Sequence, residues 1–109
     1  MKISELANKT GLKKINEYKD KNFEGVYISD MVSDIITGAK VNNLLITLQT
    51  HKSLIAAANL VDVAAIVFVK GRTPAQDVID LANKVAIGLF VSEDDAWNMA
   101  LKLFNLGIK

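Results

Sequence analysis

The fold of this chain is decided by residues 43–74, which have the sequence NLLITLQTHKSLIAAANLVDVAAIVFVKGRTP. Residues 44–48 and 64–69 are almost continuously apolar, which predicts strands that are buried on both faces. Residues 51–60 carry apolar side chains at helical spacing, and their alanines allow close packing on a sheet. Gly71 follows the second strand and tolerates a positive φ. The stretch therefore predicts a strand–helix–strand unit with tight turns.

The rest of the chain repeats this unit. Strands are predicted to begin near residues 26, 44, 65 and 87, so the later units recur about every 21 residues. Such regular alternation favours parallel strands joined by right-handed crossovers. We expect a single compact α/β domain over residues 1–109, with a mainly parallel sheet of about four strands that alternate with short helices. A weak additional edge strand is expected around Ile15 and Tyr18.

Helix starts are predicted from residues whose hydroxyl groups can cap free backbone amides. The clearest case is TPAQ at residues 73–76, where threonine fits the N-cap, proline the first helical position and glutamine a capping box. Gly11 is suited to end a first helix over residues 5–10. The residues that we expect to act as N-caps are Ser4, Thr50, Thr73 and Ser92.

The composition limits the classes of function. The chain has 109 residues, a net charge of +1 and no cysteine. It therefore lacks the basic surface of a nucleic-acid-binding protein and has no thiolate ligand or disulfide. The opening residues lack the apolar core of a signal peptide, and no apolar run reaches the ~18 residues that a membrane span needs. We expect a soluble cytoplasmic domain that binds neither nucleic acid nor a membrane.

Open parallel sheets bind ligands at the carboxyl ends of their strands, where loops lead into helix N-termini. Here that edge gathers hydroxyl groups, backbone amides and basic side chains, which suit a phosphate or another small anion. The residues that we expect to bind such a ligand are Gln49, Thr50, His51, Lys70, Gly71, Arg72 and Ser92. The alternative is that the hydroxyl groups only cap helices and the basic groups are only solvated, since no P-loop or GxGxxG pattern is present.

Catalytic and metal chemistry have little support in the sequence. His51 is the only histidine, which excludes a metal site made of two histidines. A cryptic enzyme that pairs His51 with Ser29, Ser53 or Asp30 is the least supported hypothesis. We predict no catalytic residue, no metal and no cofactor. Capping of helix N-termini is a sufficient explanation for three carboxylates that could otherwise hold Mg²⁺, namely Asp30, Asp94 and Asp95.

The order of several motifs resembles the DRTGG domain, a small bacterial and archaeal module. The similar segments cover nearly the whole chain and are MKISEL, GVYISDM, LLITLQTHKS, AAIVFVKGRTP and LFVSEDDAWNMA. The signature itself is altered. Thr50-His51 stands where an Asp-Arg pair is expected, and Val69-Lys70-Gly71 stands where Thr-Gly-Gly is expected, so only Gly71 is retained. The chain is also similar to the N-terminal part of HPr kinase and to the corresponding part of CBS-domain proteins and phosphotransacetylases.

The resemblance implies a non-enzymatic regulatory or dimerisation module. A homodimer is expected, together with a small anionic ligand such as a nucleotide or a phosphorylated metabolite. The alternative is an adaptor that binds a protein partner of a hydrogenase-linked redox system or a kinase system, without a small molecule. Trp97 and Phe104 lie seven positions apart on the last predicted helix, and we expect them either in the core or at a dimer contact.

Overall fold

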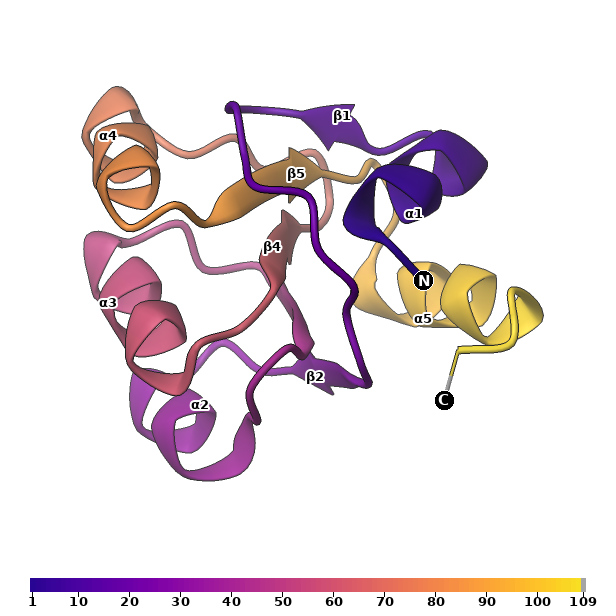
Figure 1. Cartoon of the computed structure of the whole chain (residues 1–109), viewed down its shortest axis with the longest axis horizontal. Coiled ribbons are helices and arrows are strands. Elements are labelled where there is room, and N and C mark those ends of the chain that lie inside the picture. Colours follow the sequence, from indigo (N-terminus) through magenta and orange to yellow (C-terminus); the bar gives the residue numbers. More distant parts are fainter. Residues whose placement is uncertain (109) are drawn as a thin grey trace.

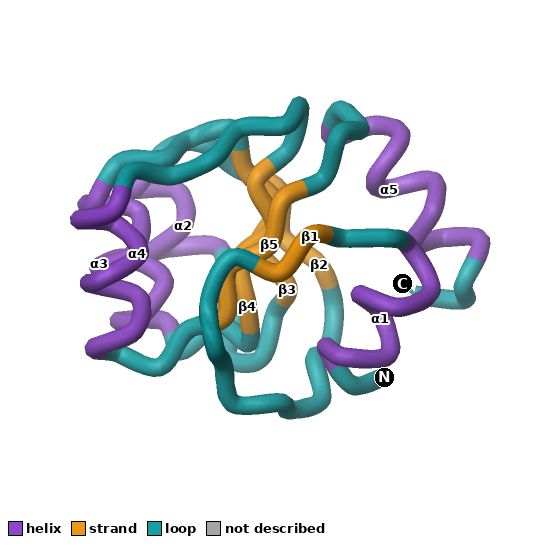
Figure 2. Tube along the Cα trace, turned by 90° about the horizontal axis from the view of Figure 1, so that it is seen from above, coloured by secondary structure: helices purple, strands orange, loops and turns teal. Residues whose placement is uncertain are grey.

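The computed structural model describes residues 1–108 and has a five-stranded sheet between two layers of helices (Figures 1 and 2). The helices are α1 (Ile3–Thr10), α2 (Val32–Gly38), α3 (Lys52–Val61), α4 (Gln76–Lys84) and α5 (Ala96–Asn105). The strands are β1 (Lys13–Lys14), β2 (Val26–Ile28), β3 (Leu44–Thr47), β4 (Ala65–Phe68) and β5 (Gly88–Val91). Within these residues, no helix has the length and the apolar character that a membrane crossing requires.

The sheet has the strand order β1-β5-β4-β3-β2, and β2 to β5 are parallel neighbours in sequence order. The three helices that connect them, α2, α3 and α4, cover one face, whereas α1 and α5 cover the other (Figure 2). Every residue of β3, β4 and β5 is buried, as expected for strands that lie between two helical layers. The predicted α/β class, with a mainly parallel sheet, is confirmed.

The edge strand β1 pairs antiparallel with β5, with Lys13 opposite Val91. It is shorter than predicted and lies just before Ile15, whose amide donates to the Leu89 carbonyl at 2.9 Å. Tyr18 lies beyond the strand and packs its ring edge-on against Phe90, with ring centroids 5.0 Å apart. An edge strand therefore exists near the predicted place, but Ile15 and Tyr18 lie after it, not on it, and anchor the segment that follows.

The side chain of Asn16 holds this edge by forming two hydrogen bonds with the backbone, as the peptide group of a paired strand residue would. Its side-chain oxygen accepts from the amide of Leu89 at 2.8 Å, and its side-chain nitrogen donates to the carbonyl of Ile87 at 2.9 Å. The same nitrogen donates to the Asn83 side chain at 3.0 Å. Asn16 is buried, so these bonds satisfy a polar group that would otherwise be costly to remove from water. No pattern in the sequence around Asn16 predicts this role.

Two of the four predicted N-caps, Ser4 and Thr73, do not cap their helices. Helix α1 begins two residues earlier than expected, and Ser4 lies inside it with its hydroxyl donating to the Asp20 carboxylate at 2.6 Å. Helix α4 begins two residues after Pro74, because the chain stays extended through Ala75 while Pro74 is buried. Thr73 therefore does not cap α4. Gly11 ends α1 in the left-handed conformation, as predicted.

Candidate functional site

The candidate site lies at the carboxyl ends of β3, β4 and β5, where hydrogen bonds join the loops that follow the three strands. The amide of Val69 donates to the Thr47 carbonyl at 3.0 Å, which holds the β4 loop against β3. On the other side, the amides of Lys70 and Gly71 donate to the carbonyls of Asp94 and Ser92 at 2.7 and 2.8 Å. The structure thus brings the predicted residues Gly71 and Ser92 into direct contact, and it joins Lys70 to the same loop through Asp94.

Residues 69–72 form a type I′ turn. Lys70 and Gly71 have φ values of 59° and 66°, and the Arg72 amide donates to the Val69 carbonyl at 3.2 Å. A positive φ at a lysine is uncommon and is held here by the bonds of the Lys70 amide to the neighbouring loop. All three turn amides are therefore engaged within the protein, so an anion at this turn would be bound by the side chains.

Glu93 was expected at this edge of the sheet, but its close approach to Gly71 was not predicted. A Cβ on Gly71 would approach its carboxylate oxygen Oε2 to 2.7 Å. Glycine is favoured here by its positive φ of 66°, and a Cβ would also require the exposed Glu93 carboxylate to move aside. The two residues are twenty-two positions apart in the sequence, so no local signal indicates that Glu93 lies over Gly71.

The basic residues of the turn differ from the charged groups around them in their ion pairing. Lys70 and Arg72 are exposed, and neither forms an ion pair within residues 1–108. Nearby, Asp94 binds Lys102 at 2.6 Å, and Lys52 at the start of α3 lies 3.6 Å from Asp77 at the start of α4. Lys70 and Arg72 are therefore the cations of this edge that remain available to a ligand.

The loop between β3 and α3 is held by a chain of side-chain hydrogen bonds. Asp30 accepts from the Thr47 hydroxyl at 2.9 Å, and that hydroxyl oxygen accepts from the Gln49 amide at 3.0 Å. The Gln49 side-chain oxygen in turn accepts from the His51 amide at 3.2 Å. Gln49 therefore orders the loop, and its side-chain oxygen already has a donor.

His51, and not Thr50, caps α3. Its Nδ1 accepts from the Ser53 amide at 3.2 Å and lies 3.0 Å from the Ser53 hydroxyl. The helix begins one residue later than predicted, which moves Thr50 outside the capping position. Both His51 and Ser53 are exposed, and no carboxylate of the described residues bonds to the imidazole, so the pair has the geometry of a helix cap. Thr50 is half-buried beside it.

Asp95, and not Ser92, caps α5. Its carboxylate accepts from the Asn98 amide at 2.8 Å. Ser92 is buried and lies three residues before this cap, where its hydroxyl accepts from the Asp94 amide at 3.1 Å. The chain needs these residues to turn from the sheet to the opposite helical layer, which delays the start of α5. Among residues 1–108, no cluster of three acidic or histidine side chains is arranged to hold a metal ion.

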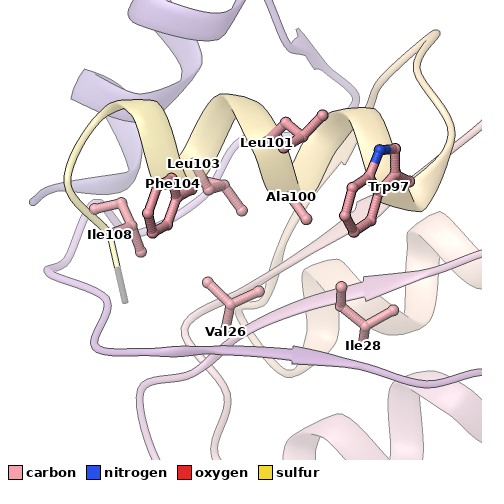
Figure 3. Close-up of a pocket in the computed structure, with 8 residues that line it drawn as sticks. All are labelled: Val26, Ile28, Trp97, Ala100, Leu101, Leu103, Phe104 and Ile108. Carbon is pink, nitrogen blue, oxygen red and sulfur yellow. The ribbon is translucent and has the colours of Figure 1, made fainter.

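An apolar groove lies away from this edge, between α5 and β2 (Figure 3). It has a volume of about 400 Å³ and is lined by Val26, Ile28, Trp97, Ala100, Leu101, Leu103, Phe104 and Ile108. Trp97 is 69% exposed and Phe104 is 67% exposed, so the prediction that they belong to the core is wrong. Their role as a dimer contact stays a prediction. A second cavity of about 290 Å³ lies between α3 and α4 and includes Lys52 and Asp77.

No family model and no curated protein matches this chain. Among solved structures, it is similar to the CBS and DRTGG domains of the regulatory region of Clostridium perfringens pyrophosphatase, which was crystallised with its activator diadenosine tetraphosphate. The likeness has a TM-score of 0.72 at 17% identity and covers 93% of this chain. The chain spans only 45% of the length of that structure. At this identity the likeness concerns the fold alone, and it confirms that the chain has a DRTGG-like fold.

Proposed function

We propose that this protein is a non-enzymatic regulatory module that binds a nucleotide or a phosphorylated metabolite at the carboxyl edge of its sheet. The observation that carries the proposal is the pair of exposed cations, Lys70 and Arg72, without an ion-pair partner in the described residues. They flank a rigid turn at the edge where parallel sheets bind ligands. The nucleotide activator of the structurally similar pyrophosphatase region supports the same class of ligand.

The geometry favours recognition through side chains. Because the amides of residues 70–72 are already bonded, phosphate oxygens would be held by the Lys70 ammonium and the Arg72 guanidinium. Loop 49–51 lies beside this turn, since Thr47 and Phe68 are paired at the ends of neighbouring strands. The half-buried Thr50 and the exposed imidazole of His51 are the groups of that loop that would contact the rest of the ligand.

The test is isothermal titration and thermal unfolding with ATP, AMP, diadenosine tetraphosphate and inorganic phosphate. Lys70→Asn is a suitable variant because asparagine tolerates the positive φ of residue 70 while the charge is lost. We expect Lys70→Asn and Arg72→Gln each to weaken binding by roughly tenfold or more. Binding should also weaken as ionic strength rises.

The matched control is Lys40→Asn. Lys40 is also an exposed lysine without an ion-pair partner in residues 1–108, but it precedes β3 and so lies at the amino edge of the sheet. Lys40→Asn should leave the affinity for the titrated compounds unchanged. If none of the four compounds binds, or if Lys40→Asn weakens binding as much as Lys70→Asn does, the proposed ligand site is wrong.

The regulatory module is further proposed to act as a homodimer. The second candidate function is an adaptor for a redox or kinase system that binds a protein and no small molecule. Its supporting observation is the apolar groove beside Trp97 and Phe104. A homodimer that covers this groove would remove that support.

A further inference from the structure

The groove between α5 and β2 is entirely apolar in its lining. Trp97, Phe104 and Leu101 of α5 are 69%, 67% and 39% exposed, and Ile28 of β2 is 49% exposed. Figure 3 shows the side chains of Val26 and Ile28 directed from β2 toward the underside of α5. A contiguous apolar surface of this kind on a small domain marks an interaction site.

The groove is bordered by an open strand edge. In the pairing of β2 with β3, the Gly25 carbonyl accepts from the Leu44 amide at 3.0 Å, and the Ser29 amide donates to the Ile46 carbonyl at 3.2 Å. Successive residues of a strand present their backbone groups to opposite sides. The amides and carbonyls of Val26 and Ile28 therefore point away from β3, at an edge of the sheet where residues 1–108 provide no further strand.

We propose that a second copy of this chain covers both features by pairing its β2 antiparallel with β2 of the first. With the two-fold axis at Tyr27, each Val26 exchanges backbone hydrogen bonds with Ile28 of the partner subunit. This axis is perpendicular to the sheet, so both α5 helices lie on the same face and bring Trp97 and Phe104 to the junction. The inference rests on the homodimer of the proposed function and names its surface.

The lining of the groove fits a second copy better than a charged partner. None of its eight side chains carries a charge, so an isologous contact places no like charges together. A self-paired β2 edge also satisfies the open backbone groups of both copies with the same geometry.

The available area is consistent with a reversible dimer. Since aromatic side chains bury about 150–250 Å² each, the exposed parts of Trp97, Phe104, Ile28 and Leu101 present roughly 450 Å² per copy. Two copies would bury roughly 900 Å² from these side chains, and the β2 backbone adds to a total near the lower limit of about 1,200 Å² for specific interfaces. We therefore expect dissociation in the micromolar range.

Sedimentation velocity over a dilution series tests the proposal. Phe104→Glu places a charge in the junction, and Ile28→Pro removes an outward amide without removing a bond to β3. The matched control is Leu60→Glu, because Leu60 is 71% exposed on α3, which covers the opposite face. We expect the wild type to dimerise, both junction variants to weaken the dimer by roughly thirtyfold or more, and the control to change it by less than about threefold.

Backbone amide exchange gives an independent measurement. The Val26 and Ile28 amides should exchange more slowly as the concentration of wild-type protein rises, and this change should be absent in Phe104→Glu. A wild type that stays monomeric overturns both the homodimer and its surface. A dimer that neither junction variant weakens overturns the surface alone. Nucleotide titration of the Phe104→Glu protein tests the ligand proposal separately from either result.

Discussion

Asp30, in the loop after β2, accepts a hydrogen bond from the hydroxyl of Thr47 at the end of β3, with an oxygen–oxygen distance of 2.9 Å. The same carboxylate oxygen accepts from the Leu48 amide at 2.7 Å. One side chain thereby joins the short edge strand to the central sheet. It also positions the loop that leads to the candidate ligand site, since the Thr47 hydroxyl oxygen accepts from the Gln49 amide.

Replacing Asp30 by alanine removes both of these bonds. Because Asp30 is exposed and water can replace part of the interaction, we expect a loss of about 1–2 kcal/mol in the free energy of unfolding. Asp30→Asn should lose less, since its amide oxygen can still accept. Urea unfolding measures the difference. Equal losses for the two variants would show that the acceptor role of Asp30 is not what stabilises this loop.

Gly38 should respond to alanine in the direction opposite to helix propensity. Alanine normally stabilises a helix relative to glycine by up to about 1 kcal/mol. At Gly38, however, a Cβ would overlap the Tyr27 hydroxyl and lie 2.6 Å from its Cζ. To make room, Tyr27 must move and give up the bond from its hydroxyl to the Asp34 carboxylate. We expect Gly38→Ala to cost about 1–2 kcal/mol.

The Tyr27→Ala background provides the control for this prediction. With the ring removed, Gly38→Ala should become neutral or stabilising, and a double-mutant cycle measured by chemical unfolding should show that change of sign. The same loss in both backgrounds would mean that the close approach of Tyr27 is not the cause.

The contact between Ser4 and Asp20 should make stability depend on pH. The hydroxyl and then the amide of Ser4 donate to the Asp20 carboxylate, and these bonds hold the pKa of Asp20 below its usual range. A carboxyl group whose folded-state pKa is depressed contributes stability above its unfolded pKa of about 4 and loses it as the pH falls through the folded pKa.

Thermal unfolding at several pH values tests this contact. Ser4→Ala should lower the melting temperature at neutral pH, and the difference from the wild type should narrow as the pH falls below about 4. Asp34 is a control carboxylate, because it is also exposed and accepts a hydrogen bond, but from Tyr27. In an Asp34→Asn background, Ser4→Ala should still lower the melting temperature more at neutral pH than at acid pH. A Ser4→Ala effect that is constant with pH would contradict the prediction.

The type I′ turn predicts opposite effects at its two central residues. Gly71→Ala introduces both an unfavourable positive φ and an approach to Glu93, so we expect a loss of about 1–3 kcal/mol. Lys70→Gly relieves a positive φ at a residue with a side chain and should be neutral or stabilising by up to about 1 kcal/mol. Chemical unfolding of the two variants checks the turn. A destabilising Lys70→Gly would indicate that the lysine side chain itself supports the fold.

The strands were predictable because their sequences are locally decisive. Residues 44–48 and 64–69 are almost continuously apolar, and such short runs are typical of strands that are covered on both faces. The helix caps were less predictable, because residues able to cap occur within three positions of one another. Thr50 and His51 compete at α3, and Ser92 and Asp95 compete at α5. Which residue becomes the N-cap depends on how many loop residues the chain needs between the strand and the place where the helix packs on the sheet.

Contacts between distant segments could not be predicted at all. Asn16 bonds to a residue seventy-three positions away, and nothing near Asn16 in the sequence specifies that partner. The cover that Glu93 forms over Gly71 likewise exists only once two loops are brought to the same edge of the sheet. The predicted site residues Lys70, Gly71 and Ser92 do meet there, because parallel topology alone places successive strand ends side by side.

The antiparallel pairing of β1 with β5 has a consequence for the order of folding. The parallel units from β2 to β5 are each completed by a neighbour about twenty residues away, whereas β1 must wait for the last strand of the chain. Closing that longer loop carries a larger entropic cost, and non-local pairings form slowly. We therefore expect the segment with α1 and β1 to dock last and to detach first. During synthesis, β1 leaves the ribosome before β5 has been made, so β1 has no partner strand until β5 follows.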